Sequence, residues 1–420
     1  MKARNPFSSE MLPDPYPYYT WLREEDPVHY VEDLDFYVVS HYDDVHAVLK
    51  NPMVFSSHAG MGIIMGSGAP GKLREFMRAR NPSGIGALGY DALSSMRTLI
   101  SSDPPDHTRL RRMVNKPFTP KAMMLLAPRI RQICEELVDD LIRANEEGKA
   151  DLIEHFAVPL PVTVIAEMLG IPADRRADFK RWSDNVVGVL SGAVIDIEKM
   201  TQSSVEMFMY FSTVLEERRR GPGLGEDLIS LLIRNNEEGD YLKTEEIIML
   251  CVLLLIAGNE TTTNLIANAA LTFFARPELW RALRTTPSLI PGAVEEVLRF
   301  DSPVQALFRA TTSEVELHGK KLRAGVPVMV LLGAANRDPR RFPEPDEFNI
   351  DRNPTDHLAF GAGIHLCLGA PLARLEAKIA AEVLLERTKK MEPNGEHARI
   401  DSFLLRGLNR LPVRFEPVRQ

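Results

Sequence analysis

The sequence of 420 residues contains only three cysteines, Cys134, Cys251 and Cys367. Three cysteines cannot build a disulfide framework, so the composition indicates a reducing compartment, and we expect a cytoplasmic protein. A basic surplus is also missing, because 50 Lys and Arg residues stand against 58 Asp and Glu residues. Proteins that bind nucleic acid usually present a basic surface, so we do not expect that function.

Long apolar runs are missing as well. The longest, residues 247–258, has 12 residues, whereas a membrane-spanning helix needs about 18 or more. Residues 1–9 contain no apolar run and include Pro6, which is not typical of a signal peptide. We therefore expect a buried core helix at 247–258 and no membrane association. Hydrophobic residues at 45% and charged residues at 26% are typical of a globular enzyme.

Helical periodicity dominates the chain, with a smaller share of β-strand patterns. Two short strands are predicted at 27–30 and 36–40, and a hairpin is predicted between 315–317 and 326–331, joined through 318–321. We find no internal repeat and no clear linker. The pattern predicts one mainly α domain, residues 1–420, with small N-terminal and C-terminal β-sheets. Helices are predicted over 41–50, 108–115, 120–145, 159–169, 174–190, 198–220, 244–274, 277–284, 288–300 and 370–389.

Glycine and methionine are concentrated in residues 56–102, among them Met61, Gly62 and Met65. A segment of this kind is either a mobile functional loop or a linker. We favour the functional loop, because the apolar side chains of a linker would have nothing to pack against. Small and flexible groups here would suit a lid that opens for a large apolar substrate.

Residues 360–369, FGAGIHLCLG, are the most informative stretch. The glycines let the backbone turn tightly and leave room for a flat ligand. Cys367 precedes a helix, whose positive end favours the thiolate, and a thiolate is a strong ligand for haem iron. Two other interpretations exist. Cys367 can be a small buried apolar residue, or it can bind zinc with His365, although zinc would need two more ligands at suitable spacing.

The run F-G-x-G-x-H-x-C-x-G resembles the haem-binding signature of the soluble bacterial cytochromes P450, and the similarity extends over nearly the whole chain in the right order. The resemblance implies that haem b lies between a long distal helix and a proximal cysteine loop. It also implies that Cys367 is the metal ligand. Further cofactor-binding residues implied in this loop are Phe360, Gly361, His365 and Gly369.

Residues 259–264 form a polar patch midway along the predicted helix 244–274. Buried polar groups are costly unless they are hydrogen-bonded or functional. From the residues alone, a local helix distortion with satisfied hydroxyls explains the patch equally well. The stretch 257–262, AGNETT, is similar to the family's distal motif, in which an acid and a threonine support proton delivery to dioxygen. This similarity implies catalytic roles for Glu260, where many relatives carry Asp, and Thr261.

Two pairs of charged residues at helical spacing are, by themselves, typical of a helix surface, but the family resemblance implies other roles for them. Glu296 and Arg299 form a common type of surface pair, and His107 and Arg111 suit a solvated basic face. The resemblance instead implies that Glu296, Arg299 and Arg352 hold the proximal side together. Arg109 and Arg112 are then left for a basic face toward an acidic electron donor. The expected partners of the haem propionates are His107, Arg111, Arg309 and His365, because arginine suits carboxylates well.

The predicted function is that of a monomeric haem–thiolate monooxygenase. It would activate dioxygen to hydroxylate or epoxidise an apolar small molecule, of fatty acid, terpenoid, steroid or polyketide type, with electrons from a separate ferredoxin-type protein. Two alternatives remain: a haem–thiolate protein with a ligand-sensing or dehydration and isomerisation role, and a haem-free helical protein with a structural or zinc site at Cys367. Candidate substrate residues, each also explained by core packing, are Ile63, Met65, Leu253, Ala257, Val304, Leu307 and Leu404.

Overall fold

The computed structural model describes residues 5–8, 11–58, 60, 63, 71–80, 98–191, 197–221, 224–237 and 242–418. Met61, Gly62 and Met65 of the proposed lid lie outside these residues, so the lid itself stays a prediction. Within residues 56–102, which the sequence led us to expect as a loop, the structure places the helix α4 (Gly71–Arg80).

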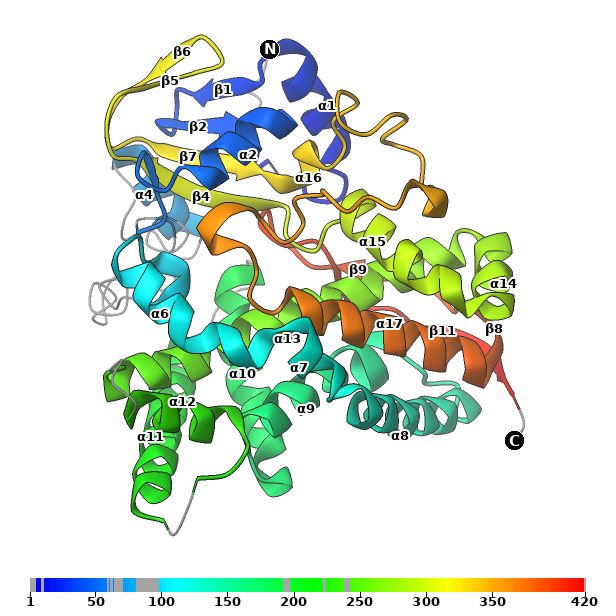
Figure 1. Cartoon of the computed structure of the whole chain (residues 1–420). Coiled ribbons are helices and arrows are strands. Elements are labelled where there is room, and N and C mark those ends of the chain that lie inside the picture. Colours follow the sequence, from blue (N-terminus) through cyan, green and yellow to red (C-terminus); the bar gives the residue numbers. More distant parts are fainter. Residues whose placement is uncertain are drawn as a thin grey trace.

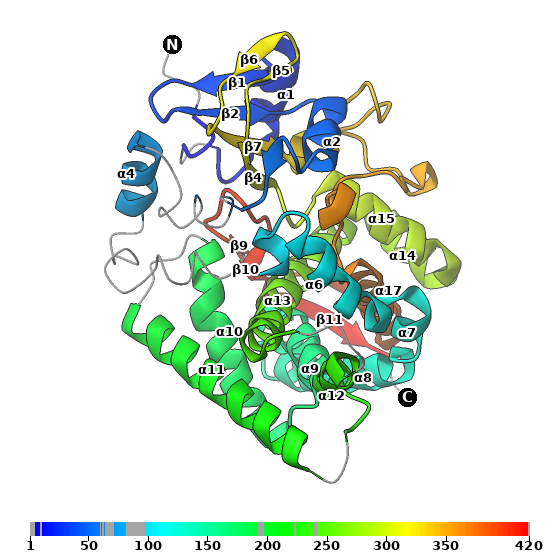
Figure 2. The same ribbon diagram turned by 60° about the vertical axis from the view of Figure 1, so that its left-hand side comes forward.

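The long helix α13 (Thr244–Phe274) runs through the middle of the helical part (Figures 1 and 2). It packs against α9 (Pro159–Met168), α10 (Arg176–Ser191), α11 (Ile197–Arg220), α15 (Ile290–Phe300) and α17 (Ala370–Arg387). By length and composition α13 would be able to cross a bilayer, yet half of its most apolar stretch is buried inside the protein. Helices on several sides make it a core helix, as the sequence predicted.

The remaining helices lie around this core or beside the β-sheet, and two of them correct a prediction. The helix expected over 120–145 is divided into α7 (Pro120–Met124) and α8 (Ala127–Glu146). Pro128 explains the break, because proline has no N–H for the carbonyl of Met124 and its ring would clash with that group. The other helices are α1 (Tyr16–Glu25), α2 (Tyr42–Lys50), α6 (Asp106–Asn115), α12 (Leu228–Glu237), α14 (Pro277–Thr285) and α16 (Leu332–Ala335).

A five-stranded sheet stands apart from the helical part (Figure 1), in the order β1-β2-β7-β4-β3. The β2–β7 pair is parallel and the other pairs are antiparallel. Along β7, Val328 and Val330 join one apolar cluster, while Met329 and Leu331 join another. This alternation follows from the two-residue period of a strand. Its strands are β1 (Val28–Val31), β2 (Phe36–Val39), β3 (Phe55–Ser56), β4 (Ala306–Thr311) and β7 (Pro327–Leu331).

Two helices near the N-terminus cover opposite faces of this sheet. Leu22 of α1 belongs to the cluster that contains Met329, and Val45 of α2 belongs to the cluster that contains Val328. Both helices therefore hold the sheet through apolar packing, which is the usual way for a sheet to bury its faces.

The predicted hairpin between 315–317 and 326–331 is wrong in its second strand. β5 (Val315–Leu317) pairs with β6 (Lys320–Leu322), and residues 327–331 join the central sheet instead. His318 and Gly319 form the turn, with φ angles of 51° and 73°. Two consecutive residues with positive φ make the tight turn that matches strand twist, so β6 starts directly after Gly319. The remaining strand pairs are β8 (Thr388–Pro393) with β11 (Val413–Pro417), and β9 (Ala398–Arg399) with β10 (Leu408–Arg410).

Candidate active site

A largely apolar cavity of about 270 Å³ lies beside Cys367, between α13, α17 and the start of β4. Of the predicted substrate residues, Leu253 and Ala257 line it from α13, and Val304 and Leu307 line it from the segment around the start of β4. Segments that are far apart in the sequence therefore meet at Cys367, as a pocket for a ligand requires.

The loop around Cys367 is shaped by its glycines. Gly361 and Gly363 have φ angles of 71° and 70°, a conformation that side chains with Cβ rarely adopt. A Cβ at Gly363 would lie 2.6 Å from the carbonyl oxygen of Leu49, so the end of α2 packs directly on the loop. The Cys367 N–H donates to the Phe360 carbonyl at 2.9 Å. Around Gly369 a Cβ would meet no atom within 4 Å, which leaves space beside the sulfur.

The Cys367 side chain is surrounded by protein and opens into the cavity, which is why it has accessible surface. Burial raises the pKa of its thiol, whereas the backbone N–H groups of Gly369 and Ala370 and the Arg111 guanidinium lower it. The predicted effect of the helix end is thus present, but burial outweighs it. A metal ion that binds the sulfur displaces the proton regardless of this balance.

Two cations near Cys367 have no carboxylate partner within the part of the chain that the structure describes. Arg309 is 7% exposed and donates to the carbonyl of Phe308 at 2.7 Å. Its burial lowers the pKa to about 10. Arg111 donates to Asn115 at 2.8 Å, and burial lowers its pKa as well. Both arginines line the cavity. Buried cations are costly without an anion, so this arrangement calls for an anionic ligand.

The rings of His107 and His365 lie 4.3 Å apart beside these arginines. The Nε2 atom of each is buried and has no hydrogen-bond partner among the described residues. Burial, followed by the nearby Arg309, lowers the pKa of His365 to about 3, so its ring is neutral at pH 7. Two unpaired cations and two unsatisfied imidazoles around one slot suit a flat ligand that carries two carboxylates, as haem does.

On the opposite wall, Thr261 faces the cavity and its hydroxyl donates to the Ala257 carbonyl at 2.7 Å. Glu260 is not among the lining residues, although it precedes Thr261. Its carboxylate accepts a hydrogen bond from Asn264 at 3.4 Å, and the side chain is half-buried. The structure therefore brings Thr261, and not Glu260, to the cavity.

Comparison with known proteins agrees with this geometry. The cytochrome P450 family model matches residues 78–286 and 288–413. The chain is 39% identical over 415 residues to cytochrome P450 monooxygenase PikC of Streptomyces venezuelae, which covers 97% of this chain and 92% of that protein. It is 38% identical over 419 residues to vitamin D(3) 25-hydroxylase of Pseudonocardia autotrophica, with 98% and 96% covered. The solved structure of cytochrome P450 CYP109Q5 from Chondromyces apiculatus is similar, with a TM-score of 0.85, 40% identity and 98% of each chain covered.

The chain belongs to the cytochrome P450 family. The predictions of the family, of the mainly helical fold and of the monooxygenase class are thereby confirmed. Membership also establishes the haem–thiolate cofactor of the family, which the unpaired groups around Cys367 fit.

One cavity residue of this cytochrome P450 was missed in the sequence. Glu376 of α17 is 2% exposed, and burial raises its pKa to about 8, against a smaller lowering by a hydrogen bond with Thr262. Both side chains line the cavity. Glu376 shares a helix face with the apolar residues Leu372 and Ile379, four before it and three after it. An acid on an apolar face was the signal that would have revealed it.

The three residues assigned a structural role lie together. Glu296 and Arg299 are fully buried and joined by two hydrogen bonds of 2.7 and 2.9 Å. Arg352 reaches the same carboxylate at 3.2 Å. Arg299 also donates to the carbonyls of Asn336, Pro345 and Glu347. The network therefore joins α15 to the loop that leads toward Cys367.

Several predicted positions differ in the structure. Ile63 and Leu404, expected to contact substrate, are 0% and 5% exposed and belong to the apolar cluster on the sheet instead. They pack there because the sheet face offers apolar neighbours. Arg109, expected on a basic outer face, pairs with Glu246 of α13. Met65 lies outside the described residues.

Proposed function

We propose that this cytochrome P450 is a monomeric, cytoplasmic monooxygenase that hydroxylates or epoxidises an apolar small molecule with electrons from a separate ferredoxin-type protein. The observation that carries the proposal is the pocket itself. It joins the Cys367 sulfur to unpaired cationic and imidazole groups on one side and to Thr261 on the other.

The residues of the chain divide the work of holding the cofactor. The Cys367 sulfur would bind the haem iron, and Phe360, Gly361 and Gly369 line the cavity next to it. When bound, the haem supplies the activation of dioxygen, and thiolate donation assists O–O cleavage. The two propionates would be held by His107, Arg111, Arg309 and His365.

Thr261 would handle a proton at the oxygen side of the pocket. Its hydroxyl hydrogen is directed to the Ala257 carbonyl, which leaves the lone pairs of Oγ1 free to accept a hydrogen bond from a water molecule in the cavity. Rotation of the hydroxyl would then return its own hydrogen to the cavity. Glu260 lies outside the cavity lining, so we assign it the supply of protons from the solvent side.

The substrate class follows from the lining. Leu250, Leu253, Leu254 and Leu265 of α13 face the cavity with Val304 and Leu307, and most of the surface is apolar. A relative whose match covers 98% of this chain is a vitamin D(3) 25-hydroxylase. Both facts support a large apolar substrate of steroid or terpenoid type, oriented by shape more than by hydrogen bonds.

An exposed surface near Cys367 supports a protein electron donor. Leu366, next to the ligand, is 48% exposed, and Met124 and Leu125 of the α7 end, which packs near α17, are 58% and 79% exposed. Arg112 of α6, Lys121 of α7 and Lys116, which lies between these two helices, are also exposed. Apolar residues beside positive charges suit an acidic ferredoxin.

The absorption spectrum of the reduced protein with carbon monoxide tests the ligand assignment. We expect a strongly red-shifted Soret band, which Cys367→Ala should abolish, because alanine supplies no thiolate. An unchanged band in the variant would reject the assignment. Incorporation of one labelled oxygen atom into product separates a monooxygenase from a sensing or isomerising haem protein.

Turnover of the Thr261→Ala variant tests the proton role. We expect it to bind haem and substrate normally but to release several-fold more hydrogen peroxide per electron consumed, because the cavity loses its hydroxyl. Thr261→Ser keeps the hydroxyl and is the matched control. Full coupling of electrons to product in the alanine variant would remove Thr261 from the relay.

A further inference from the structure

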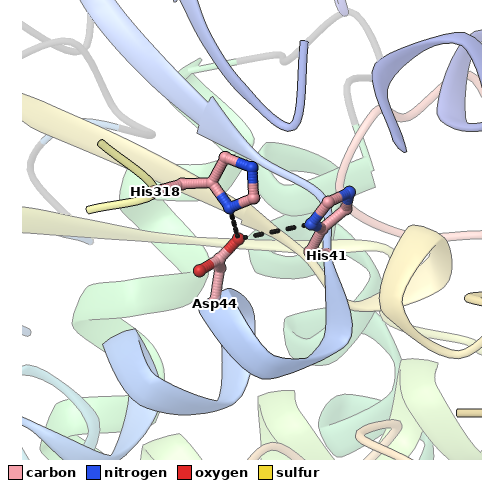
Figure 3. A group of neighbouring side chains, drawn as sticks. All are labelled: His41, Asp44 and His318. Atoms are coloured by element: carbon pink, nitrogen blue, oxygen red, sulfur yellow. Dashed lines mark ion pairs between the residues drawn. The ribbon is translucent and has the colours of Figure 1, made fainter. Parts of the chain in front are cut away.

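Two histidines and one aspartate converge at the side of the β-sheet, outside the cavity lining (Figure 3). His41 directly precedes α2, Asp44 lies in the first turn of α2, and His318 occupies the turn of the β5–β6 hairpin. The Asp44 Oδ2 atom lies 3.5 Å from His41 Nδ1 and 3.2 Å from His318 Nδ1. All three atoms lie within 4.8 Å of one another.

The hydrogen bond on the far side of the His41 ring decides its tautomer. Nε2 lies 2.8 Å from the carbonyl oxygen of Arg23, and this contact requires an N–H on Nε2. A neutral ring with hydrogen on Nε2 presents a bare lone pair on Nδ1. That lone pair is directed toward the carboxylate of Asp44.

The Asp44 carboxylate also has an unused lone pair. Its Oδ2 atom is buried and has no hydrogen-bond partner among the described residues. Arg340 and Asp338 are other charged groups that act on His41. They are paired with each other at 2.9 Å, so neither of them supplies a partner for the Asp44 carboxylate. Two sets of lone pairs therefore face one another, and a cation between them would satisfy both.

The spacing of the ligand atoms fits a small divalent ion. Two ligands held about 2.0–2.1 Å from a tetrahedral zinc ion are roughly 3.3 Å apart, close to the 3.2 and 3.5 Å between Asp44 and the two imidazoles. His318 is 45% exposed, so its ring can turn to close the remaining gap. The Arg23 carbonyl supplies the outer hydrogen bond that orients metal-bound histidines in proteins.

We propose that His41 Nδ1, His318 Nδ1 and Asp44 Oδ2 bind one divalent transition-metal ion of the zinc type, with water completing the coordination. Imidazole ligands favour zinc, nickel and copper over magnesium and calcium. The ion would fasten the β5–β6 hairpin to the start of α2, whose other end packs against Gly363 of the cysteine loop. Because the ion would bind the folded state and not the unfolded state, it would raise the unfolding temperature.

Calorimetric titration with zinc chloride tests the site. The haem-loaded protein, free of any polyhistidine tag, is treated with EDTA and desalted first, and the bound haem keeps Cys367 from the zinc. We expect one zinc ion per chain and a rise in the unfolding temperature. His318→Asn should weaken binding at least tenfold, and asparagine tolerates the left-handed turn conformation of this residue (φ 51°).

His397→Ala is the matched control, because His397 is exposed and is not part of the cluster. This variant should bind zinc as the parent does. Binding by His318→Asn as tight as the parent's, or no binding by the parent, would overturn the proposal. Anomalous diffraction from crystals grown with zinc gives an independent outcome: a peak between Asp44 and the two histidines supports the site, and a peak elsewhere rejects it.

Discussion

Glu296 and Glu376 are two buried carboxylates in different regions of the molecule, and their surroundings differ sharply. Glu296, on the proximal side, meets Arg299 at 2.7 Å and Arg352 at 3.2 Å. Glu376, at the cavity, has Thr262 as its hydrogen-bond partner and forms no ion pair among the described residues, so burial raises its pKa to about 8. The proximal network pairs its charges and holds the fold, whereas Glu376 and Arg309 at the cavity form no ion pair among the described residues.

The same contrast holds for the arginines. Arg299 is fully buried and donates to Glu296 and to three carbonyls. Arg309 is almost as buried but donates to one carbonyl of its own strand. A protein tolerates such an unpaired buried cation where a ligand completes the site. Of these two buried arginines, the one without a carboxylate partner lies at the cavity, and the paired one holds the proximal side together.

The largest effect is expected where the paired network is broken. Glu296→Ala leaves the buried Arg299 without its carboxylate, and removing one partner of a buried pair costs about 3–5 kcal/mol. Chemical denaturation of the haem-loaded protein should show a loss of this size. Arg352→Ala removes the more exposed partner and should cost less. Equal small losses for both variants would contradict the assigned role.

A smaller effect is expected for Glu376→Gln, which keeps the shape of the side chain and removes its charge. The folded pKa of Glu376 is about 8, above the unfolded value of about 4.3, so its contribution to stability is fully present below pH 4 and is lost as the pH rises through 8. The variant lacks this loss. The stability of the variant relative to the parent should therefore rise by about 2–3 kcal/mol between pH 5 and pH 7, and by about 1 kcal/mol more between pH 7 and pH 9.

Thermal unfolding of the two proteins at pH 5, 7 and 9 measures this gain. Glu295→Gln serves as a comparison, because the neighbouring His357 and Arg374 hold the pKa of Glu295 at about 2, against the effect of burial, and its charge is unchanged over that range. A pH-independent difference between Glu376→Gln and the parent would show that Glu376 is ionised at pH 5 already.

The smallest effect on stability is expected for Arg309, the buried cation without a carboxylate partner. Arg309→Gln removes a buried charge without a carboxylate partner, so the haem-free protein should be as stable as the parent or more stable. Haem should leave the variant about tenfold faster, since a charge-assisted hydrogen bond to a carboxylate is lost. Transfer of haem to an acceptor protein measures the rate. A haem-loss rate equal to the parent's would remove Arg309 from the propionate site.

Local signals in the sequence determined much of the fold. The long helix was predicted at Thr244–Phe274, with the ends that the structure shows, because apolar residues dominate on both sides of its polar patch and its boundaries are set by nearby residues. The cysteine loop was recognised for the same reason, since its glycines and Cys367 lie within ten residues. The turn at His318 and Gly319 was local too, but its two-residue length was not recognised and the wrong strand was paired.

The tertiary structure decided which of these residues meet. Leu404 and Leu307 are equally apolar in the sequence, yet one packs on the sheet and the other faces the cavity. Glu376 became an uncharged acid, and His41 and His318 came together around Asp44, because segments far apart in the chain enclosed them. Secondary structure follows from neighbours along the chain. Burial, pairing of charges and convergence of ligands follow from neighbours in space, which periodicity cannot specify.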